Sequence, residues 1–178
     1  VLGTIYAGTD LGVFKSTNSS VSWAAGNSGL RAVTVSALAI DPAAPMTLYT
    51  GTYRNGGLFK SVNGGQTWHV INTGLNADSV LSLAIHPANT STVYAGTDGS
   101  GVFKSTNGGE NWREINDGLT QFRIYALAID PVTPSNLYVA ANGVFRSTNG
   151  GDNWVAVNDG LIETNIRALA IDSTTSTT

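Results

Sequence analysis

Cysteine, charge and long apolar runs are missing or scarce in this 178-residue sequence. Without cysteine, the chain can form neither disulfide bonds nor thiolate metal sites. Charged residues make up 12% of the chain, about half the usual share. The net charge of -3 gives no electrostatic reason to expect binding to nucleic acid or to an anionic membrane. No apolar run approaches the roughly 20 residues of a membrane-spanning helix, so we expect no such span.

Repetition is the most prominent feature that the sequence does have. The octapeptide Ser-x-Asn-x-Gly-x-x-Trp occurs three times intact and once eroded, at 16–23, 61–68, 105–112 and 147–154. The starting serines lie 45, 44 and 42 residues apart. A unit of this length is too short for a core of its own. Each unit must therefore bury its apolar face against the next one.

Each repeat is predicted to contain four short antiparallel strands. In the third repeat these are the runs 81–85, 93–97, 101–105 and 112–115, which are rich in β-branched and aromatic residues and bounded by Gly, Pro, Asn or Asp. The first run of each set is nearly all apolar, as in Ala-Leu-Ala-Ile at 126–129, which predicts a strand buried on both faces. The Trp strand is mixed in polarity, as expected of an outer edge. These features predict an all-β β-propeller of four-stranded antiparallel blades, innermost strand first.

The octapeptide then lies in the hairpin between the third and fourth strands. Its Ser and Asn side chains can bond to the backbone of the turn, Gly supplies a positive φ, and Trp seals the turn against the sheet. The residues assigned to this structural role are Ser16, Asn18, Trp23, Ser61, Asn63, Gly65, Trp68, Ser105, Asn107, Gly109, Trp112, Ser147, Asn149, Gly151 and Trp154.

This motif between these two strands resembles the Asp-box, or bacterial neuraminidase repeat (BNR). Asp-boxes occur in the propellers of sialidases, xyloglucan-type glycoside hydrolases, sortilin-type receptors and photosystem II assembly factors. The resemblance covers essentially the whole chain, and the phrase Tyr-Ala-Gly-Thr followed by Gly-Val-Phe-Lys-Ser-Thr-Asn-Gly-Gly, at 94–97 and 101–109, closely resembles bacterial surface members. It specifies the fold but hardly the activity, because the family includes enzymes, receptors and assembly factors. The chain departs from the pattern by carrying Asn where Asp is frequent, and by Ser19 and Ser20 in place of Gly-Gly.

The chain is predicted to be one propeller domain or segment, 1–178. Its repeats lie at about 1–35, 36–80, 81–124 and 125–166, and a strand at 167–172 is placed to complete the first blade. A closed four-bladed ring, an eight-bladed ring of two chains, and part of a longer chain with a larger ring all remain open. A lone open arc would expose apolar flanks. The start without an initiator Met suggests a mature chain or one cut from a longer protein.

The repeats differ most in the loops at the end opposite the Asp-box turns. In the family that the motif resembles, this face carries substrate or partner sites, and loops free of packing roles often carry function. Drift at exposed turns is the alternative explanation. The candidate binding residues on this face are Tyr53, Arg54, Asn55, Asp98, Phe122 and Arg123.

A glycosidase would need two carboxylates on opposite sides of the scissile bond. The candidates on the variable face are Asp10, Asp78, Asp98 and Glu163, whereas the repeated Asp41, Asp130 and Asp172 are interpreted as turn-formers. The two histidines, His69 and His86, belong to different strand contexts and make no ligand set. The sequence therefore assigns no catalytic residue, metal or cofactor, and whether the chain is an enzyme stays open.

The favoured hypothesis is a non-enzymatic binding or scaffold module of a bacterial protein, secreted or associated with the cell envelope. Its partner would be a protein or a glycan, bound on the variable loop face. One alternative is a fragment of a sialidase- or xyloglucanase-like glycoside hydrolase. Another is a structural repeat of a surface or filament protein.

Overall fold

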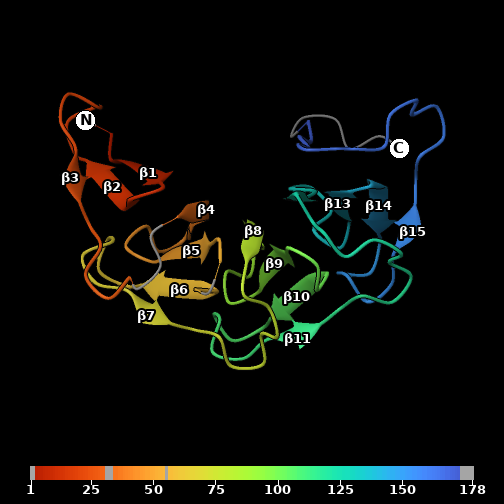
Figure 1. Cartoon of the computed structure of the whole chain (residues 1–178), viewed down its shortest axis with the longest axis horizontal. Helices are drawn as coiled ribbons and strands as arrows, with labels where there is room; N and C mark the ends of the chain where they lie inside the picture. The colour runs from red at the N-terminus through yellow and green to blue at the C-terminus, as the bar shows by residue number, and fades with distance from the viewer. Residues whose placement is uncertain (1–2, 31–33, 55, 173–178) are drawn as a thin grey trace.

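The computed structural model describes residues 3–30, 34–54 and 56–172, and its regular structure is all β. Four antiparallel sheets follow one another in chain order along an open arc (Figure 1). This is the blade arrangement of a β-propeller, as the repeats predict. Among the described residues there is no helix long and apolar enough to cross a membrane.

Each sheet is one blade, numbered here from the N-terminus. Blade 1 comprises β1 (Ile5–Thr9), β2 (Gly12–Ser16) and β3 (Ala24–Ala25). Blade 2 comprises β4 (Val35–Ile40), β5 (Leu48–Thr52), β6 (Leu58–Ser61) and β7 (His69–Val70). Blade 3 comprises β8 (Val80–Ile85), β9 (Val93–Thr97), β10 (Val102–Ser105) and β11 (Arg113–Glu114). Blade 4 comprises β12 (Ala126–Ile129), β13 (Leu137–Ala141), β14 (Gly143–Ser147) and β15 (Val155–Ala156).

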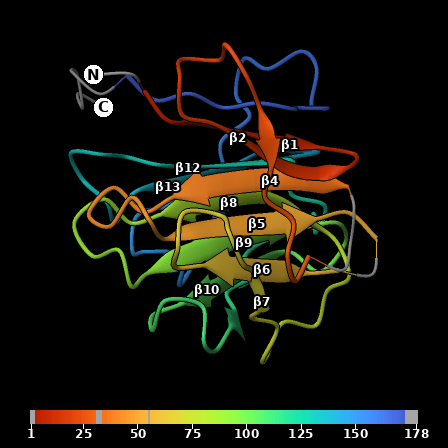
Figure 2. The ribbon, with the colours of Figure 1, turned by 90° about the vertical axis from the view of Figure 1, so that its left-hand side faces the viewer.

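The strands of each blade pair in sequence order, as the polarity of the repeats predicts. In blades 2, 3 and 4 the apolar strand forms one edge of the sheet and the short strand after the Asp-box turn forms the other. The apolar edges lie inside the arc and the short strands outside it (Figure 1). Figure 2 shows the same order from the side, from β4 and β8 through β5 and β9 to β6 and β10.

The innermost strands are less buried than expected from their composition. All four residues of β12 are only half-buried, and Ile40 at the end of β4 is exposed. The second strands are instead the most buried, since every residue of β5 and of β9 is buried. The prediction of burial on both faces was therefore wrong for the innermost strands. The free edge of each innermost strand faces the open centre of the arc, whereas each second strand is paired with a strand on both sides.

The hydrophobic core lies between the blades rather than within them. One cluster joins Val13 of blade 1 to Leu48, Phe59 and Trp68 of blade 2. Two equivalent clusters join blade 2 to blade 3 and blade 3 to blade 4. Each of these clusters of described residues spans two blades, which is the dependence on neighbours that the length of the repeat predicts.

The predicted closing strand at 167–172 does not form in this structure. The segment begins as the innermost strand of a next blade would, because the amide of Ile166 donates to the carbonyl of Ala141, as the amide of Ile124 does to the carbonyl of Thr97. Blade 1, whose β1 would have to receive it, lies at the opposite tip of the arc (Figure 1). Within the described residues, blade 1 therefore has three strands.

Candidate binding face

Two sets of loops meet at the end of the arc opposite the Asp-box turns, and we call this end the loop face. One set connects the second and third strands of a blade, and the other connects each blade to the next. Backbone contacts join the two sets: the amide of Tyr53 donates to the carbonyl of Thr34, and Asp98 forms a bridge with Arg123. The prediction that these variable loops share one end of the propeller is confirmed.

An ion pair links blade 3 to the connection that enters blade 4. The Arg123 guanidinium meets the Asp98 carboxylate at two points, Nε to Oδ1 at 2.6 Å and Nη2 to Oδ2 at 3.0 Å. The nearby Asp98 raises the pKa of Arg123, so this arginine stays charged. Tyr125 lies beside the pair, and the guanidinium carbons of Arg123 and Arg167 lie 5.5 and 4.0 Å from its ring centroid.

A polar cavity of about 440 Å³ lies between blades 2 and 3 on the same face. Its lining contains one apolar residue, Ala77, and six polar or charged ones: Arg54, Asn76, Asp78, Ser79, Asp98 and Ser100. The walls come from the β5–β6 loop, the connection between blades 2 and 3, and the β9–β10 loop. A lining of this kind suits a charged or strongly hydrogen-bonding ligand better than an apolar one.

Arg54 and Asp78 bring a positive and a negative charge to this cavity. Arg54 has a φ of 62°, and its amide is held by the Ser79 hydroxyl at 2.9 Å. Its guanidinium lies 5.1 Å from the ring centroid of Tyr53. Within the described part of the chain, neither the Arg54 guanidinium nor the Asp78 carboxylate takes part in an ion pair. A non-glycine residue held at positive φ is a strained position, which is often found at functional sites.

The structure brings several of the predicted binding residues together. Arg54 and Asp98 line the cavity, Tyr53 lies under Arg54, and Arg123 binds Asp98. Phe122 is 44% exposed, and its carbonyl accepts hydrogen bonds from the amides of Gly99 and Gly101. Asn55 lies outside the described residues.

The four candidate acids do not form one site. Asp78 and Asp98 share the cavity, whereas Asp10 lies in the β1–β2 turn of blade 1 and Glu163 follows blade 4, where it caps the amide of Asn165. Asp41 and Asp130 are confirmed as turn-formers, because each accepts two amide hydrogen bonds from the residues two and three positions later. No group of three potential metal-ligating side chains gathers within the part of the chain that the structure describes.

The candidate binding residues did not include Asn76, Ser79, Ser100, Tyr125 and Arg167. The first three lie in loops that the comparison of the repeats places on this face, but Ser and Asn are so abundant in the chain that their type gave no signal. Tyr125 and Arg167 lie just before the apolar runs of two inner strands, outside the variable loops. Only the way in which the blades are stacked brings these residues together.

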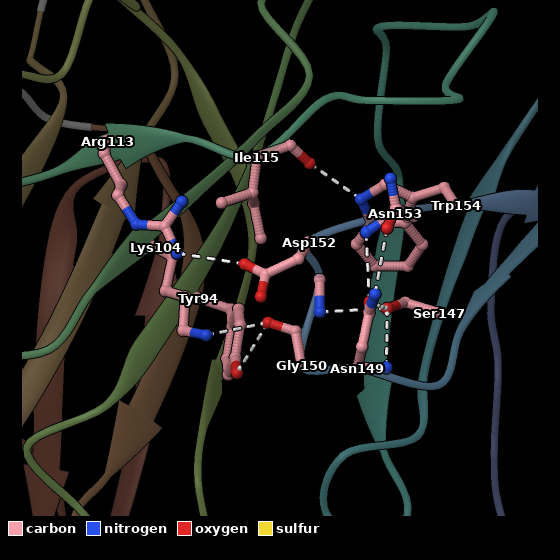
Figure 3. A network of polar contacts seen from close by, with 11 residues as sticks. Tyr94, Lys104, Arg113, Ile115, Ser147, Asn149, Gly150, Asp152, Asn153 and Trp154 are labelled. Carbon is pink, nitrogen blue, oxygen red and sulfur yellow. Dashed lines mark hydrogen bonds and ion pairs between the residues drawn. The ribbon is translucent and has the colours of Figure 1, made fainter.

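The Asp-box turns lie at the other end and connect neighbouring blades. In the fourth turn the Ser147 hydroxyl binds Asn149 and accepts the amide of Gly151 at 2.9 Å (Figure 3). The carbonyl of Gly150 accepts from Tyr94 and Lys104 of blade 3 at 3.2 and 2.8 Å. Burial, with Asp152 adding to it, raises the pKa of Tyr94, and burial lowers the pKa of Lys104.

The tryptophan of the motif also reaches across to the preceding blade. The Trp154 indole Nε1 donates to the carbonyl of Ile115 at 2.7 Å (Figure 3), and Trp68 and Trp112 make the same bond to Gly26 and Ile71. The turn bonds expected of the motif are present in the three intact copies, whereas Trp23 of the eroded copy is 43% exposed. The Asp-boxes of blades 2, 3 and 4 each join their blade to the preceding one.

A comparison with models of known protein families agrees with the fold described above. The model of the family described as Sortilin, neurotensin receptor 3, matches residues 56–167, which is more than half of the chain. The chain belongs to this sortilin family. No curated protein sequence matches it.

Solved structures similar to this sortilin-family chain are Asp-box propellers. An ancestral GH74 enzyme is 29% identical with a TM-score of 0.76, and the match covers 88% of this chain and 22% of that one. The GH74 xyloglucanase from Xanthomonas campestris is 18% identical with a TM-score of 0.70, covering 92% and 29%. YCF48 bound to D1 peptide is 18% identical with a TM-score of 0.64, covering 89% and 52%. The chain thus spans between about a fifth and a half of the structures that it matches, and it corresponds to part of a larger propeller.

Proposed function

We propose that this propeller segment is a non-enzymatic binding module that holds a charged peptide segment of a partner protein in the cavity between blades 2 and 3. The observation that carries the proposal is the pair of opposite charges on the walls of one polar cavity, Arg54 and Asp78, neither of which forms an ion pair within the described residues. A peptide with both a basic and an acidic side chain could satisfy both walls at once. The similarity to YCF48, solved with D1 peptide, supports a peptide ligand on this fold.

The neighbouring ion pair supports the same role. Because Arg123 occupies both oxygens of Asp98, it fixes the far wall of the cavity and leaves Asp78 as the acid available to a ligand. The backbone of Arg54 is held at positive φ by the hydrogen bond from its amide to the Ser79 hydroxyl, which fixes the place from which the arginine side chain extends. Charges already held in place bind a ligand with less loss of conformational entropy. We place the module outside the cell or at the cell envelope, in keeping with its surface rich in Thr and Asn.

The proposal is tested with an array of dodecapeptides of acidic, basic and mixed charge, and with calorimetry on the peptides that bind. Asp78→Asn and Arg54→Gln should each weaken the binding of mixed-charge peptides by about tenfold or more, because a hydrogen bond to a charged group contributes about 1.5–3 kcal/mol. Asp152→Asn removes an exposed acid at the Asp-box end and is the matched control. Equal affinities for the three variants, or no binding of any peptide, would refute the proposal.

A second candidate is glycoside hydrolysis, which the shared cavity of Asp78 and Asp98 and the similarity to GH74 enzymes favour. Hydrolysis of a glycosidic bond needs at least two carboxylates that face the same cavity. Turnover of xyloglucan oligosaccharides or aryl-glycosides by the chain, lost in Asp78→Asn and in Asp98→Asn but kept in Asp10→Asn, would establish it. Absence of turnover by the unchanged chain would leave the binding role.

A further inference from the structure

A groove of about 410 Å³ lies between blades 3 and 4 at the Asp-box end. Part of its lining is a set of bonds that all three joints share. A tyrosine and a lysine on neighbouring strands of one blade donate to the carbonyl of the first motif glycine in the next blade. These bonds run from Tyr6 and Lys15 to Gly64, from Tyr49 and Lys60 to Gly108, and from Tyr94 and Lys104 to Gly150. Tyr94, Lys104 and Gly150 line the groove (Figure 3).

Lys104 brings a positive charge and unused donors to this groove. An ammonium group has three N–H donors, and within the described residues Lys104 makes one hydrogen bond, to Gly150 at 2.8 Å. The acid that acts on it, Asp152, is bound by Arg113 at 3.1 Å (Figure 3). Burial, with Arg113 acting in the same direction and Asp152 against it, lowers the pKa of Lys104. An anion in the groove would offset the cost of keeping this lysine charged.

Thr92 lines the groove with a hydroxyl group that has no partner. The other buried threonines among the described residues, Thr50, Thr52 and Thr97, each donate to a backbone carbonyl. Thr92 is 6% exposed, and within the described residues its side chain makes no hydrogen bond. Every fully buried side-chain nitrogen or oxygen of the described structure has a partner, so this hydroxyl must open onto the groove. A ligand oxygen would remove the cost of leaving it unpaired.

His86 adds a donor where another blade has an acid. Its Nδ1 accepts the amides of Ala88 and Asn89, so the ring proton lies on Nε2, which can donate to a ligand. Asp41 has the same place in the turn of blade 2, and its carboxylate contributes to the raised pKa of Tyr49. A carboxylate would make the stronger turn bonds, so the turn alone does not account for the histidine. With His86 the groove gains a donor in place of a negative charge.

The rest of the lining favours the same kind of ligand. Thr106 and Ser135 add two exposed hydroxyl groups, one from each blade. Among the described residues that line the groove, none is acidic. The cavity on the loop face differs in this respect, because Asp78 and Asp98 line it. The groove between blades 3 and 4 therefore combines one cation with neutral hydrogen-bond donors, a combination that suits an anion.

We infer that the groove between blades 3 and 4 binds an oxyanion, the phosphate or carboxylate group of a ligand, through Lys104, His86 and Thr92. The Lys104 ammonium supplies the charge and donates to one oxygen. The His86 imidazole and the Thr92 hydroxyl donate to the others. This site lies at the opposite end of the blades from the cavity of the proposed function, and neither site depends on the other.

The test is a titration of the chain with sodium phosphate and, separately, with sodium acetate, at constant ionic strength held with sodium chloride. NMR follows the backbone amides of Thr92 and Ser135. We expect saturable shifts at these amides with at least one of the two salts. Saturation by phosphate alone assigns the site to phosphate groups, by acetate alone to carboxylates, and by both to either group. Shifts that do not saturate with either salt, or that spread evenly over the chain, would overturn the site.

Thr92→Val isolates the hydroxyl, because valine has a similar shape. Affinity for the anion should fall by about tenfold, as expected for a lost hydrogen bond to a charged group. Thermal stability should be unchanged or higher, because the hydroxyl has no partner in the folded chain. Thr47→Val is the matched control, since Thr47 has the same place in the turn of blade 2, and it should leave the affinity unchanged. An unchanged affinity in Thr92→Val would refute the site.

His86→Asp puts a carboxylate into the groove. It should weaken anion binding by at least tenfold, because a repelling charge replaces a donor. Stability should not fall, since the turn keeps its acceptor, so unfolding cannot explain the loss. His69→Asp is the control, because it makes the same change of charge at an exposed position of β7. Equal affinities of His86→Asp and His69→Asp would contradict the assignment.

Discussion

The indole of Trp154 binds the backbone of Ile115, a residue 39 positions earlier in the chain and in the preceding blade. The bond places the most recognisable residue of the repeat at a joint between two sheets. The motif therefore contributes to the stability of the arc rather than to that of a single hairpin. Its effect should be measurable as a loss of overall stability when the donor is removed.

Trp154→Phe should lower the free energy of unfolding by about 2–4 kcal/mol, because it removes the N–H that binds Ile115 and leaves a cavity at a buried site. Urea denaturation at one fixed protein concentration measures the change. Val155→Ala alters the next residue, which is 65% exposed, and should change stability by no more than about 0.5 kcal/mol. A loss in Trp154→Phe as small as that control would contradict the role of the joint.

Ser20→Gly and Gly109→Ser should have opposite effects on stability. Ser20 has a φ of 69°, so glycine relieves a left-handed conformation, and we expect a gain of about 0.5 kcal/mol after the entropy of the unfolded glycine is counted. Gly109 has a φ of 91°, and a Cβ there meets Ile71. We expect a loss of about 2 kcal/mol. Both changes are read from thermal unfolding, and a shared sign would show that the eroded turn differs from the intact ones.

Tyr49 gives the fold a dependence on alkaline pH. Burial, with a smaller contribution from Asp41, raises the pKa of Tyr49 to about 12, compared with about 10 in the unfolded chain. Between these values the unfolded state loses the phenolic proton while the folded state keeps it. The stability is therefore complete below pH 10 and falls as the pH rises toward 12, by up to about 2.7 kcal/mol for this group.

Tyr49→Phe isolates this contribution, since it removes the titration but keeps the ring. The carbonyl of Gly108 retains its bond from Lys60 at 2.9 Å. The free energy of unfolding of Tyr49→Phe should fall less steeply than that of the unchanged protein between pH 10 and pH 12. Parallel curves would mean that Tyr49 is not the residue responsible.

His86 takes the place of a turn aspartate, and the substitution His86→Asp tests this equivalence. Its Nδ1 accepts the amides of Ala88 and Asn89 at 3.2 and 3.0 Å, as Asp130 accepts those of Val132 and Thr133. A carboxylate makes stronger bonds of this kind, so His86→Asp should raise stability by about 0.5–1 kcal/mol at neutral pH. His86→Ala, the control, should lower it by about 1 kcal/mol because it removes the acceptor.

Much of the fold could be predicted because the same pattern of turn residues and short apolar runs occurs in four repeats. Alternation of turn residues with short apolar runs gave the strands, and the place of Trp112 and Trp154 after the turn gave the outer edge. The burial of the innermost strands was mispredicted because composition cannot show that one edge of β12 has no sheet beside it. The strand predicted at 167–172 is not formed here, because β1, which would pair with it, lies at the far tip of the arc (Figure 1).

The candidate site was only partly predictable. Differences between the repeats led to Arg54, Asp98 and Arg123, which the structure places around one cavity and one ion pair. Tyr125 and Arg167 were not among the predicted binding residues. Nothing within either repeat distinguishes them, and they come into contact only because the segment after blade 4 packs beside blade 4. The sequence of a single repeat does not show which of its side chains will contact the next repeat.

Because the three joints among the described blades use the same donors and acceptors, these bonds do not specify how many blades the ring should have. Copying one unit of 42 to 45 residues would add a blade whose Asp-box turn fits the preceding blade, and whose own second and third strands could receive the Asp-box turn of another. The length of such a protein can therefore change by gene duplication without any new interface having to arise. The ring size is then decided by the small angle between neighbouring sheets, a property of side-chain volume at the joints.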